Sequence, residues 1–142
     1  MVADCVFCAI VAGSVPAFTV VEDGAGVGFL DTRPVFKGHV LVVPRTHVVQ
    51  LVDLDPELLP GYFGLVQRVA AAVPAALGAQ GTFVAINNVV SQSQPHLHTH
   101  VVPRTKGDGL RGFFWPRTKY ASDDEAASYA AKIAAALPVS GS

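Results

Sequence analysis

Charged residues are scarce in this chain of 142 residues, and neither sign dominates. Lys and Arg together number 10, Asp and Glu number 11, and the formal net charge is −1. A protein that binds along a nucleic-acid backbone carries a basic patch or a basic excess, so this composition argues against nucleic acid as a partner. Hydrophobic residues make up 51% of the chain, which is typical of a globular protein and excludes a disordered one.

Long apolar runs are missing as well, and cysteine is rare. No stretch approaches the roughly 18 apolar residues that a membrane-spanning helix requires. The first residues include Asp4 and lack the basic region of a signal peptide, so we expect a cytoplasmic protein with no membrane partner. The two cysteines, Cys5 and Cys8, provide no disulfide framework. In a reducing compartment, their C-x2-C spacing indicates redox or metal chemistry instead.

Short β-branched runs separated by turn residues predict an α+β fold. The sequence has no internal repeat, no low-complexity segment and no linker, and its length fits one domain, so we expect residues 1–142 to form a single domain. Most predicted strands follow one another through short turns, which favours an antiparallel sheet with few helices beside it. The predicted strands cover residues 19–22, 27–31, 38–43, 82–88 and 96–102.

Two helices are predicted from their start signals. Asp55 and the proline after it are typical of an N-cap followed by a first turn, and this helix should run toward Leu77. Prolines inside the segment should shorten or kink it. The second helix is expected over residues 123–137, where Ser122 and Glu125 match a capping box.

Three of the five histidines alternate in the stretch HLHTH, at His96, His98 and His100. Residues two apart on a strand share one face and lie about 6.6 Å apart, so all three imidazoles should project to one side. This pattern allows three interpretations: an exposed face rich in histidine, a three-histidine zinc site of the catalytic type, or a nucleophilic imidazole with partners beside it.

The other two histidines also fall close together: His39 lies at the start of the strand predicted over 38–43, and His47 follows that strand. Cys5 and Cys8 alone are two ligands short of a tetrahedral zinc site, so two histidines would have to complete it. A redox pair of the thioredoxin type follows a strand, and nothing strand-like precedes Cys5. Zinc is therefore the favoured interpretation of the cysteine pair.

The stretch HLHTHVV resembles the signature H-φ-H-φ-H-φ-φ, with φ apolar, of the histidine triad (HIT) family of nucleotide hydrolases and transferases. Three further stretches resemble the family in the same order and spacing: CVFCAIVAGSVPAFTVVED, FLDTRPVFKGHVLVVPRTH and INN. The resemblance covers about the first three quarters of the chain. It implies a HIT-like fold, with an antiparallel sheet of about five strands, a central helix and a C-terminal helix. It also implies a core over about residues 5–104 and a substrate or dimer segment over 105–142.

The resemblance implies catalytic roles for three histidines. His98 matches the family residue that attacks the α-phosphate of a nucleotide to form a nucleotidyl-histidine, which water then resolves. His100 matches the residue that contacts phosphate and supplies a proton to the leaving group. His39 matches a fourth histidine that completes the network, although a strand-end histidine with a structural role is the alternative. The chemical step requires no metal in this mechanism.

The resemblance also implies nucleotide-binding roles. Asp31 matches a residue that holds the ribose hydroxyls, and a turn aspartate is its alternative. Gln92 and Ser93 lie where family members place polar side chains against the phosphate, with Asn88 on the same rim; a polar loop without such contacts is the alternative. The base is expected among four apolar residues that a core would explain equally well: Phe7, Ile10, Phe29 and Leu30.

For the metal, the resemblance implies a closed Cys₂His₂ zinc site, made of Cys5, Cys8, His47 and His96. Because four protein ligands leave no open position, the zinc would be structural. It would tie the N-terminal segment to the catalytic strand. This assignment takes His96 away from the chemistry and replaces the three-histidine zinc interpretation.

The chain departs from the family pattern in several places. Thr99 stands where an apolar residue is usual, and the loop over 88–96 is short and ends in Pro95, which puts the phosphate contacts of that loop in doubt. The C-terminal segment is not part of the common pattern. Its aromatic residues either form an interface or cover the sheet: Phe113, Phe114 and Trp115.

Together these features predict a homodimeric enzyme that cleaves a purine nucleoside phosphoramidate or a dinucleoside polyphosphate at the α-phosphate and releases a nucleoside monophosphate. The main alternative is a non-catalytic, nucleotide-binding regulatory module with a structural zinc. Because His39, His98 and His100 are all present, the enzyme is favoured. A zinc-dependent nucleic-acid binder is disfavoured by the near-neutral charge.

Overall fold

The computed structural model describes residues 4–111 and 116–138. The chain forms two compact units, Met1–Asp108 and Gly109–Ser142, which are described one at a time. The first unit contains the sheet, and every residue assigned above to catalysis, nucleotide or metal falls within it. In the described part of the chain, no helix has both the length and the apolar character needed to cross a membrane.

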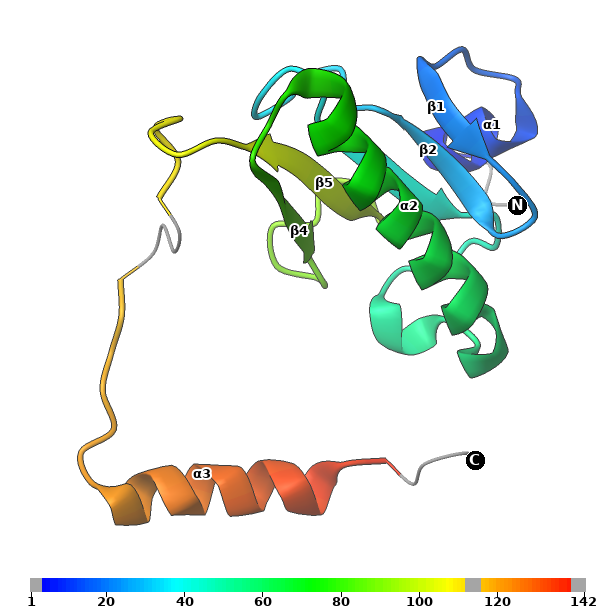
Figure 1. Ribbon diagram of the computed structural model, residues 1–142. Helices are drawn as coiled ribbons and strands as arrows, with labels where there is room; N and C mark the ends of the chain where they lie inside the picture. Colours follow the sequence, from blue (N-terminus) through cyan, green and yellow to red (C-terminus); the bar gives the residue numbers. More distant parts are fainter. Residues whose placement is uncertain (1–3, 112–115, 139–142) are drawn as a thin grey trace. The chain divides into compact units, whose positions relative to one another are not determined.

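A five-stranded antiparallel sheet forms the centre of the first unit (Figure 1). Asp23 closes the turn between its first two strands, because its Oδ1 accepts hydrogen bonds from the backbone N–H groups of Ala25 and Gly26 at 2.7 and 3.2 Å. The α+β fold predicted from the sequence is confirmed. In the spatial order β1-β2-β3-β5-β4, the strands are β1 (Thr19–Glu22), β2 (Gly26–Leu30), β3 (Val40–Pro44), β5 (Thr99–Arg104) and β4 (Gly81–Ile86).

Strand β5 begins later than the alternating histidines suggest. The sequence predicts a strand over 96–102, but β5 starts at Thr99, and His96 and His98 lie in the loop before it. Backbone hydrogen bonds within this loop and to the segment after β3 replace the strand ladder there. The expectation that all three imidazoles share one face of a strand is therefore wrong. Only His100 is part of the sheet, where it pairs with β3 and β4.

A short helix that the sequence analysis did not predict, α1 (Val6–Ala12), precedes the sheet. Cys5 is its N-cap, and the Cys5 sulfur accepts a hydrogen bond from the backbone N–H of Cys8 at 3.3 Å. The helix ends at Gly13, whose φ of 80° is a left-handed conformation that favours glycine. Both cysteines therefore lie at the start of a helix and are buried.

The long helix α2 (Leu59–Leu77) begins after two short 3-10 helices, η1 (Leu51–Asp53) and η2 (Pro56–Leu58). Asp55 was expected to cap this helix, but it caps η2, where its Oδ1 accepts a backbone N–H at 3.0 Å. Pro74 lies inside α2, which nonetheless continues to the predicted end at Leu77. A single missing N–H in the last turn does not end the helix, because packing against the sheet holds the preceding turns.

The two faces of the sheet carry two separate cores, because side chains alternate along β3. Val40 and Val42 belong to the core that α2 covers (Figure 1), whereas Leu41 and Val43 belong to the core that α1 covers. On the α2 side, the Tyr62 hydroxyl donates to the carbonyl oxygen of Val42 at 2.8 Å and lies 2.7 Å from the Thr99 hydroxyl. A polar residue is accommodated at position 99, where an apolar one is usual, because the Thr99 hydroxyl has a buried hydrogen-bond partner, Tyr62, on α2. His100 pairs with Leu41 and so faces the α1 side.

The second unit contains α3 (Asp123–Ala136), close to the predicted bounds. The Ser122 hydroxyl accepts the backbone N–H of Glu125 at 3.1 Å, and the Glu125 carboxylate accepts the N–H of Ala121 at 2.8 Å. None of the residues of α3 is buried. The aromatic residues 113–115, expected at an interface or over the sheet, lie outside the described residues.

Candidate active site

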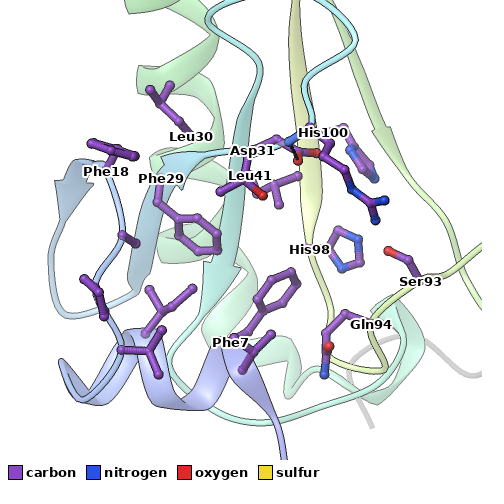
Figure 2. Close-up of a pocket in the computed structure, with 17 residues that line it drawn as sticks. Phe7, Phe18, Phe29, Leu30, Asp31, Leu41, Ser93, Gln94, His98 and His100 are labelled. Carbon is purple, nitrogen blue, oxygen red and sulfur yellow. Dashed lines mark hydrogen bonds between the residues drawn. The ribbon is translucent and has the colours of Figure 1, made fainter.

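A pocket of about 580 Å³ opens on the α1 side of the sheet (Figure 2). Its apolar wall contains all four residues expected to surround a base, Phe7, Ile10, Phe29 and Leu30, and the rings of Phe7 and Phe29 meet edge to face at 5.5 Å. Its other end is polar. The polar or ionisable side chains that line it are Asp31, Thr32, Arg33, Ser93, Gln94, His98 and His100.

His98 is held in one tautomer by the loop that precedes it. Its Nδ1 lies 2.8 Å from the carbonyl oxygen of His96. A carbonyl oxygen only accepts, so Nδ1 carries the proton and Nε2 has a free lone pair when the ring is neutral. The ring lies edge to face with Phe7 at 5.1 Å, and in Figure 2 it stands between Phe7 and Ser93. A ring nitrogen with a free lone pair thus belongs to a residue that lines the polar end of the pocket.

His39 and His100 form a second hydrogen-bonded pair with defined tautomers. The backbone N–H of Val35 donates to Nδ1 of His39 at 3.1 Å, so that nitrogen is the acceptor and His39 Nε2 carries the proton. Nε2 of His39 lies 3.0 Å from Nδ1 of His100 and donates to it. The remaining nitrogen of His100, Nε2, therefore carries a proton. The series of hydrogen bonds from Val35 through His39 to His100 therefore leaves an N–H donor on His100, a residue that lines the pocket.

Burial keeps this pair uncharged at neutral pH. Desolvation lowers the pKa of His100 to about 4, with further lowering by the neighbouring His98 and His39. Desolvation also lowers the pKa of His39, against the opposing effect of the Asp31 carboxylate. Asp31 Oδ2 lies 3.7 Å from His39 Nδ1, within ion-pair distance but too long for a hydrogen bond, and the neutral His39 ring does not pair fully with the carboxylate charge. In the resting site, His100 is a hydrogen-bond donor and not a charged acid.

The lowered pKa of His100 makes stability depend on pH in a defined direction. A histidine whose pKa falls on folding binds its proton more tightly in the unfolded chain, so its contribution is present above the unfolded pKa of about 6.5 and is lost as pH falls toward about 4. Because His100 is only partly buried, we expect the free energy of unfolding to fall by roughly 1 to 2 kcal/mol from this residue between pH 7 and pH 5.

Urea unfolding at the two pH values measures this loss. His100→Asn keeps a polar side chain without titrating in this range, so its loss of stability between pH 7 and pH 5 should be smaller than that of the unsubstituted chain by the same amount. Metal-linked effects of pH are common to both proteins and cancel in the difference. Equal losses in the two proteins would refute a buried, neutral His100.

Asp31 is a turn aspartate that also lines the pocket, and its contact with a ribose stays a prediction. It follows the last residue of β2, and its Oδ1 accepts the backbone N–H of Arg33 at 2.9 Å, as a turn aspartate does. The backbone N–H of Asp31 donates to the carbonyl of His39 at 2.9 Å. The same carboxylate lines the pocket beside Leu30 (Figure 2). The turn bond uses Oδ1, so Oδ2 is the oxygen left for a ligand hydroxyl.

Of the four polar residues predicted to contact ribose or phosphate, two line the pocket and two form hydrogen bonds that hold the neighbouring loop. Asp31 and Ser93 line the pocket, together with Gln94, which was not predicted. Asn88 Oδ1 accepts the backbone N–H of residue 51 at 2.9 Å, and Gln92 Nε2 donates to the carbonyl of residue 49 at 2.6 Å. Asn88 and Gln92 thus fasten the loop, and their contact with phosphate stays a prediction.

The loop carries backbone strain between these two anchors. Val89 has φ 69° and Ser91 has φ 63°, in the left-handed region that non-glycine residues seldom occupy. The backbone N–H of Val89 is held by Gln92 Oε1 at 3.1 Å, which helps to keep the unusual conformation. Strain of this kind persists where the surrounding structure fixes it. The residues that follow the strained segment, Ser93 and Gln94, line the pocket.

A second cluster, none of whose members lines the pocket, brings together the four predicted metal ligands. Cys8 Sγ lies 3.2 Å from His47 Nδ1 and 3.5 Å from His96 Nδ1. Cys5 Sγ lies 3.4 Å from His96 Nδ1, and the two imidazole nitrogens lie 3.1 Å apart. Cys5, Cys8, His47 and His96 could therefore hold one metal ion.

The donor chemistry fits zinc. Tetrahedral zinc with Zn–S near 2.3 Å and Zn–N near 2.05 Å separates sulfur from nitrogen by about 3.5 Å and two nitrogens by about 3.3 Å, close to the distances in the cluster. His96 Nε2 lies 3.1 Å from the carbonyl oxygen of Pro44 and donates to it, which leaves Nδ1 as the ligand atom. Both cysteines are buried, and neither forms a disulfide.

Sequence reasoning missed part of the pocket because it missed α1. The helix and the segment after it supply several wall residues, among them Val6, Pro16 and Phe18. Gly13, a typical helix-ending glycine, is the one sequence signal that points to this helix. Arg33 and Gln94 were also missed as lining residues. Nothing in their local sequence distinguishes them from ordinary turn residues.

The five-stranded antiparallel sheet, with histidines beside a largely apolar pocket, defines an α+β class of protein, and comparison with known proteins identifies the family. Residues 12–107 match the model of the HIT domain, so the chain belongs to the HIT family.

A HIT-like protein of Mycobacterium tuberculosis is 44% identical over 108 residues, which cover 75% of each chain. The adenosine 5'-monophosphoramidase of Schizosaccharomyces pombe is 32% identical over 79% of this chain and 83% of its own. The adenylylsulfatase of Arabidopsis thaliana is 32% identical over 75% of this chain and 55% of its own.

Solved structures agree on the fold. A HIT family protein from Bacillus subtilis superposes with a TM-score of 0.87 at 34% identity, covering 96% of this chain and 99% of that one. A zinc-bound histidine triad family protein from Mycobacterium smegmatis superposes with a TM-score of 0.71 at 40% identity, covering 93% of this chain and 97% of that one. The HIT-like fold predicted from the sequence is thus confirmed.

Proposed function

We propose that this chain is an enzyme that cleaves purine nucleoside phosphoramidates or dinucleoside polyphosphates at the α-phosphate, through a nucleotidyl-histidine, and releases a nucleoside monophosphate. The observation that carries the proposal is the pair of fixed tautomers: a bare Nε2 on His98 and an N–H on Nε2 of His100, both on residues that line one pocket. The phosphoramidase and adenylylsulfatase relatives support the reaction class.

In the first step, the lone pair of His98 Nε2 forms a bond to the α-phosphorus, and the bond to the leaving group breaks with its electron pair on that group. The ring becomes positively charged, and the carbonyl of His96 stabilises the charge through its hydrogen bond to Nδ1. The bound phosphate raises the pKa of the His39–His100 pair, because a nearby anion favours the charged imidazole. The pair takes up a proton with the substrate and gives it to a departing amine, which returns both rings to the neutral state.

In the second step, water attacks the phosphorus from the side the leaving group has vacated. The N–P bond breaks, its electron pair returns to His98 Nε2, and the proton lost by the water passes to solvent by way of His100. Two moderate barriers replace one high barrier, which is the advantage of covalent catalysis. Asp31 Oδ2 accepts a ribose hydroxyl, and Ser93 donates to a non-bridging phosphate oxygen. Asn88 and Gln92 act on the same phosphate through the loop that they hold.

We further propose that Cys5, Cys8, His47 and His96 bind a structural Zn²⁺. The metal would supply cross-links and no chemistry, because four protein ligands leave no position for substrate or water. Its ligands join the start of α1, the segment after β3 and the loop before β5. His96 is also the residue whose carbonyl orients His98, so the metal would hold the nucleophile in place. The homodimer and the cytoplasmic location stay predictions.

Chromatography of the products tests the proposal. Incubation with adenosine 5'-phosphoramidate and, separately, diadenosine tetraphosphate should release AMP from at least one substrate, and the faster substrate identifies the preferred leaving group. A regulatory module, the alternative function, would bind AMP in a calorimetric titration and release none from either substrate. That combination of results would overturn the enzymatic proposal.

A further inference from the structure

Arg33 is a cation at the pocket that the proposed mechanism does not use. It lines the same pocket as His98 and His100, and it is exposed to solvent. Within residues 4–111 and 116–138, the ion pairs of the structure involve other cations, and no acidic side chain neutralises Arg33. An arginine beside a reaction centre without a carboxylate partner has its donors available for a ligand anion.

The backbone holds Arg33 at this place. Its N–H donates to Asp31 Oδ1 at 2.9 Å, which closes a turn directly after β2. Asp31 is in turn tied to His39, the second residue of the imidazole pair, by a backbone hydrogen bond at 2.9 Å. The start of the Arg33 side chain is therefore fixed relative to the residues that would hold the ribose and the leaving group. Only the outer part of the Arg33 side chain has to move to contact a ligand.

The charge of the pocket also points to an anionic ligand group. Of the residues that line it, Asp31 is the acidic one and Arg33 the permanently charged basic one. His100 is neutral at pH 7, because burial lowers its pKa to about 4. If Asp31 serves the ribose, Arg33 is the lining residue left to balance charge on the phosphate side of a substrate.

We infer that Arg33 selects substrates whose leaving group is an anion, such as sulfate or phosphate, over substrates whose leaving group is an amine. This inference rests on the proposed function, since it assigns the specificity of the same site. When His98 attacks an adenylyl sulfate, the bridging P–O bond breaks and sulfate departs with one more negative charge than it had in the substrate. A guanidinium near the departing oxygens stabilises that charge through paired hydrogen bonds.

Arg33 and His100 should therefore affect the two kinds of substrate in opposite ways. Sulfate is a very weak base and departs without a proton, so it depends on the cation. An amine departs only when protonated, so it depends on His100 and gains little from a cation. Substitution of Arg33 should impair the sulfate substrate more, and substitution of His100 should impair the amide substrate more.

The test measures kcat/KM for adenosine 5'-phosphosulfate and adenosine 5'-phosphoramidate with the full chain. Arg33→Gln should lower the ratio of the sulfate value to the amide value by about tenfold or more. Arg33→Lys, which keeps the charge, should restore part of the ratio. His100→Asn should raise the ratio. Arg68→Gln is the matched control, because Arg68 is an exposed arginine on α2 paired with Asp23, away from the pocket, and it should leave the ratio as it is.

Ionic strength provides a second readout. Salt screens exposed charges, so raising KCl from about 0.05 to about 0.5 M should lower the ratio of the unsubstituted chain and have little effect on that of Arg33→Gln. If Arg33→Gln and Arg68→Gln give the same ratio while both substrates turn over, the inference on Arg33 is overturned and the proposed function stands. If neither substrate yields AMP with the unsubstituted chain, the proposed function itself is overturned.

Discussion

His98→Ala is expected to lower the rate of AMP release by about 10⁴-fold or more, because it removes the atom that bonds to phosphorus. His39, His100 and the pocket cannot replace it, since both remaining imidazoles use Nδ1 as an acceptor within their own hydrogen-bond chain. The substitution removes one hydrogen bond, to the His96 carbonyl, and an edge contact with Phe7. Affinity for AMP should therefore fall much less than the rate.

The control for this variant is its folded state. Circular dichroism, the melting temperature and the metal content should remain close to those of the unsubstituted chain, because the four proposed metal ligands are intact. A turnover reduced only a few-fold in a well-folded His98→Ala protein would contradict the assignment of the nucleophile. His39→Ala is an informative companion, since it leaves His98 in place and removes the donor that fixes the tautomer of His100. Its loss of rate should be smaller.

Loss of the metal is expected to have the second large effect, on stability. Cys8→Ser should reduce the zinc content from about one ion per chain to near zero, because Cys8 Sγ contacts both imidazole ligands and serine is a poor zinc ligand. The cluster joins three segments that are distant in the sequence, so the free energy of unfolding should fall by on the order of 3 kcal/mol and the melting temperature by roughly 10 °C.

Elemental analysis and thermal denaturation measure both effects in the same samples. A strong chelator should reproduce the change in the unsubstituted chain, and added zinc should reverse it there but not in Cys8→Ser. Ser14→Ala is a suitable control, because Ser14 is an exposed residue just beyond the same helix and makes no contact with the cluster. Zinc near zero in protein purified without chelator, with an unchanged melting temperature, would refute the structural metal.

Much of the fold follows from the sequence, because the elements are punctuated by residues with strong local preferences. Four strands lie within two residues of their predicted bounds, and α2 ends at Leu77 as expected. Helix α1 was missed because seven residues are too few for a clear apolar period, and its cysteines draw attention to metal chemistry. The start of β5 was predicted too early because alternating residues suggest a strand even where the backbone forms loop hydrogen bonds instead. This is the case at His96 and His98.

The candidate site, like the fold, could be predicted from the sequence only in part. Residue types and spacing single out the histidines and cysteines that the fold brings together. The tautomers depend on contacts between distant segments, such as Val35 with His39 and His39 with His100. The contacts of polar loop residues are even harder to predict from the sequence. Asn88 and Gln92 have the chemistry of phosphate ligands, and only the folded loop reveals that they bond to the backbone of residues 49–51.

The most direct measurement of the central claim is to stop the reaction with adenosine 5'-phosphoramidate in alkaline denaturant within milliseconds and to map the modified peptide by mass spectrometry. An adenylyl group on His98 that forms and decays at rates consistent with turnover is the predicted result. It should be absent from His98→Ala and present in Arg68→Gln. Turnover without any adenylylated peptide, or with the adenylyl group on a different residue, would contradict the account.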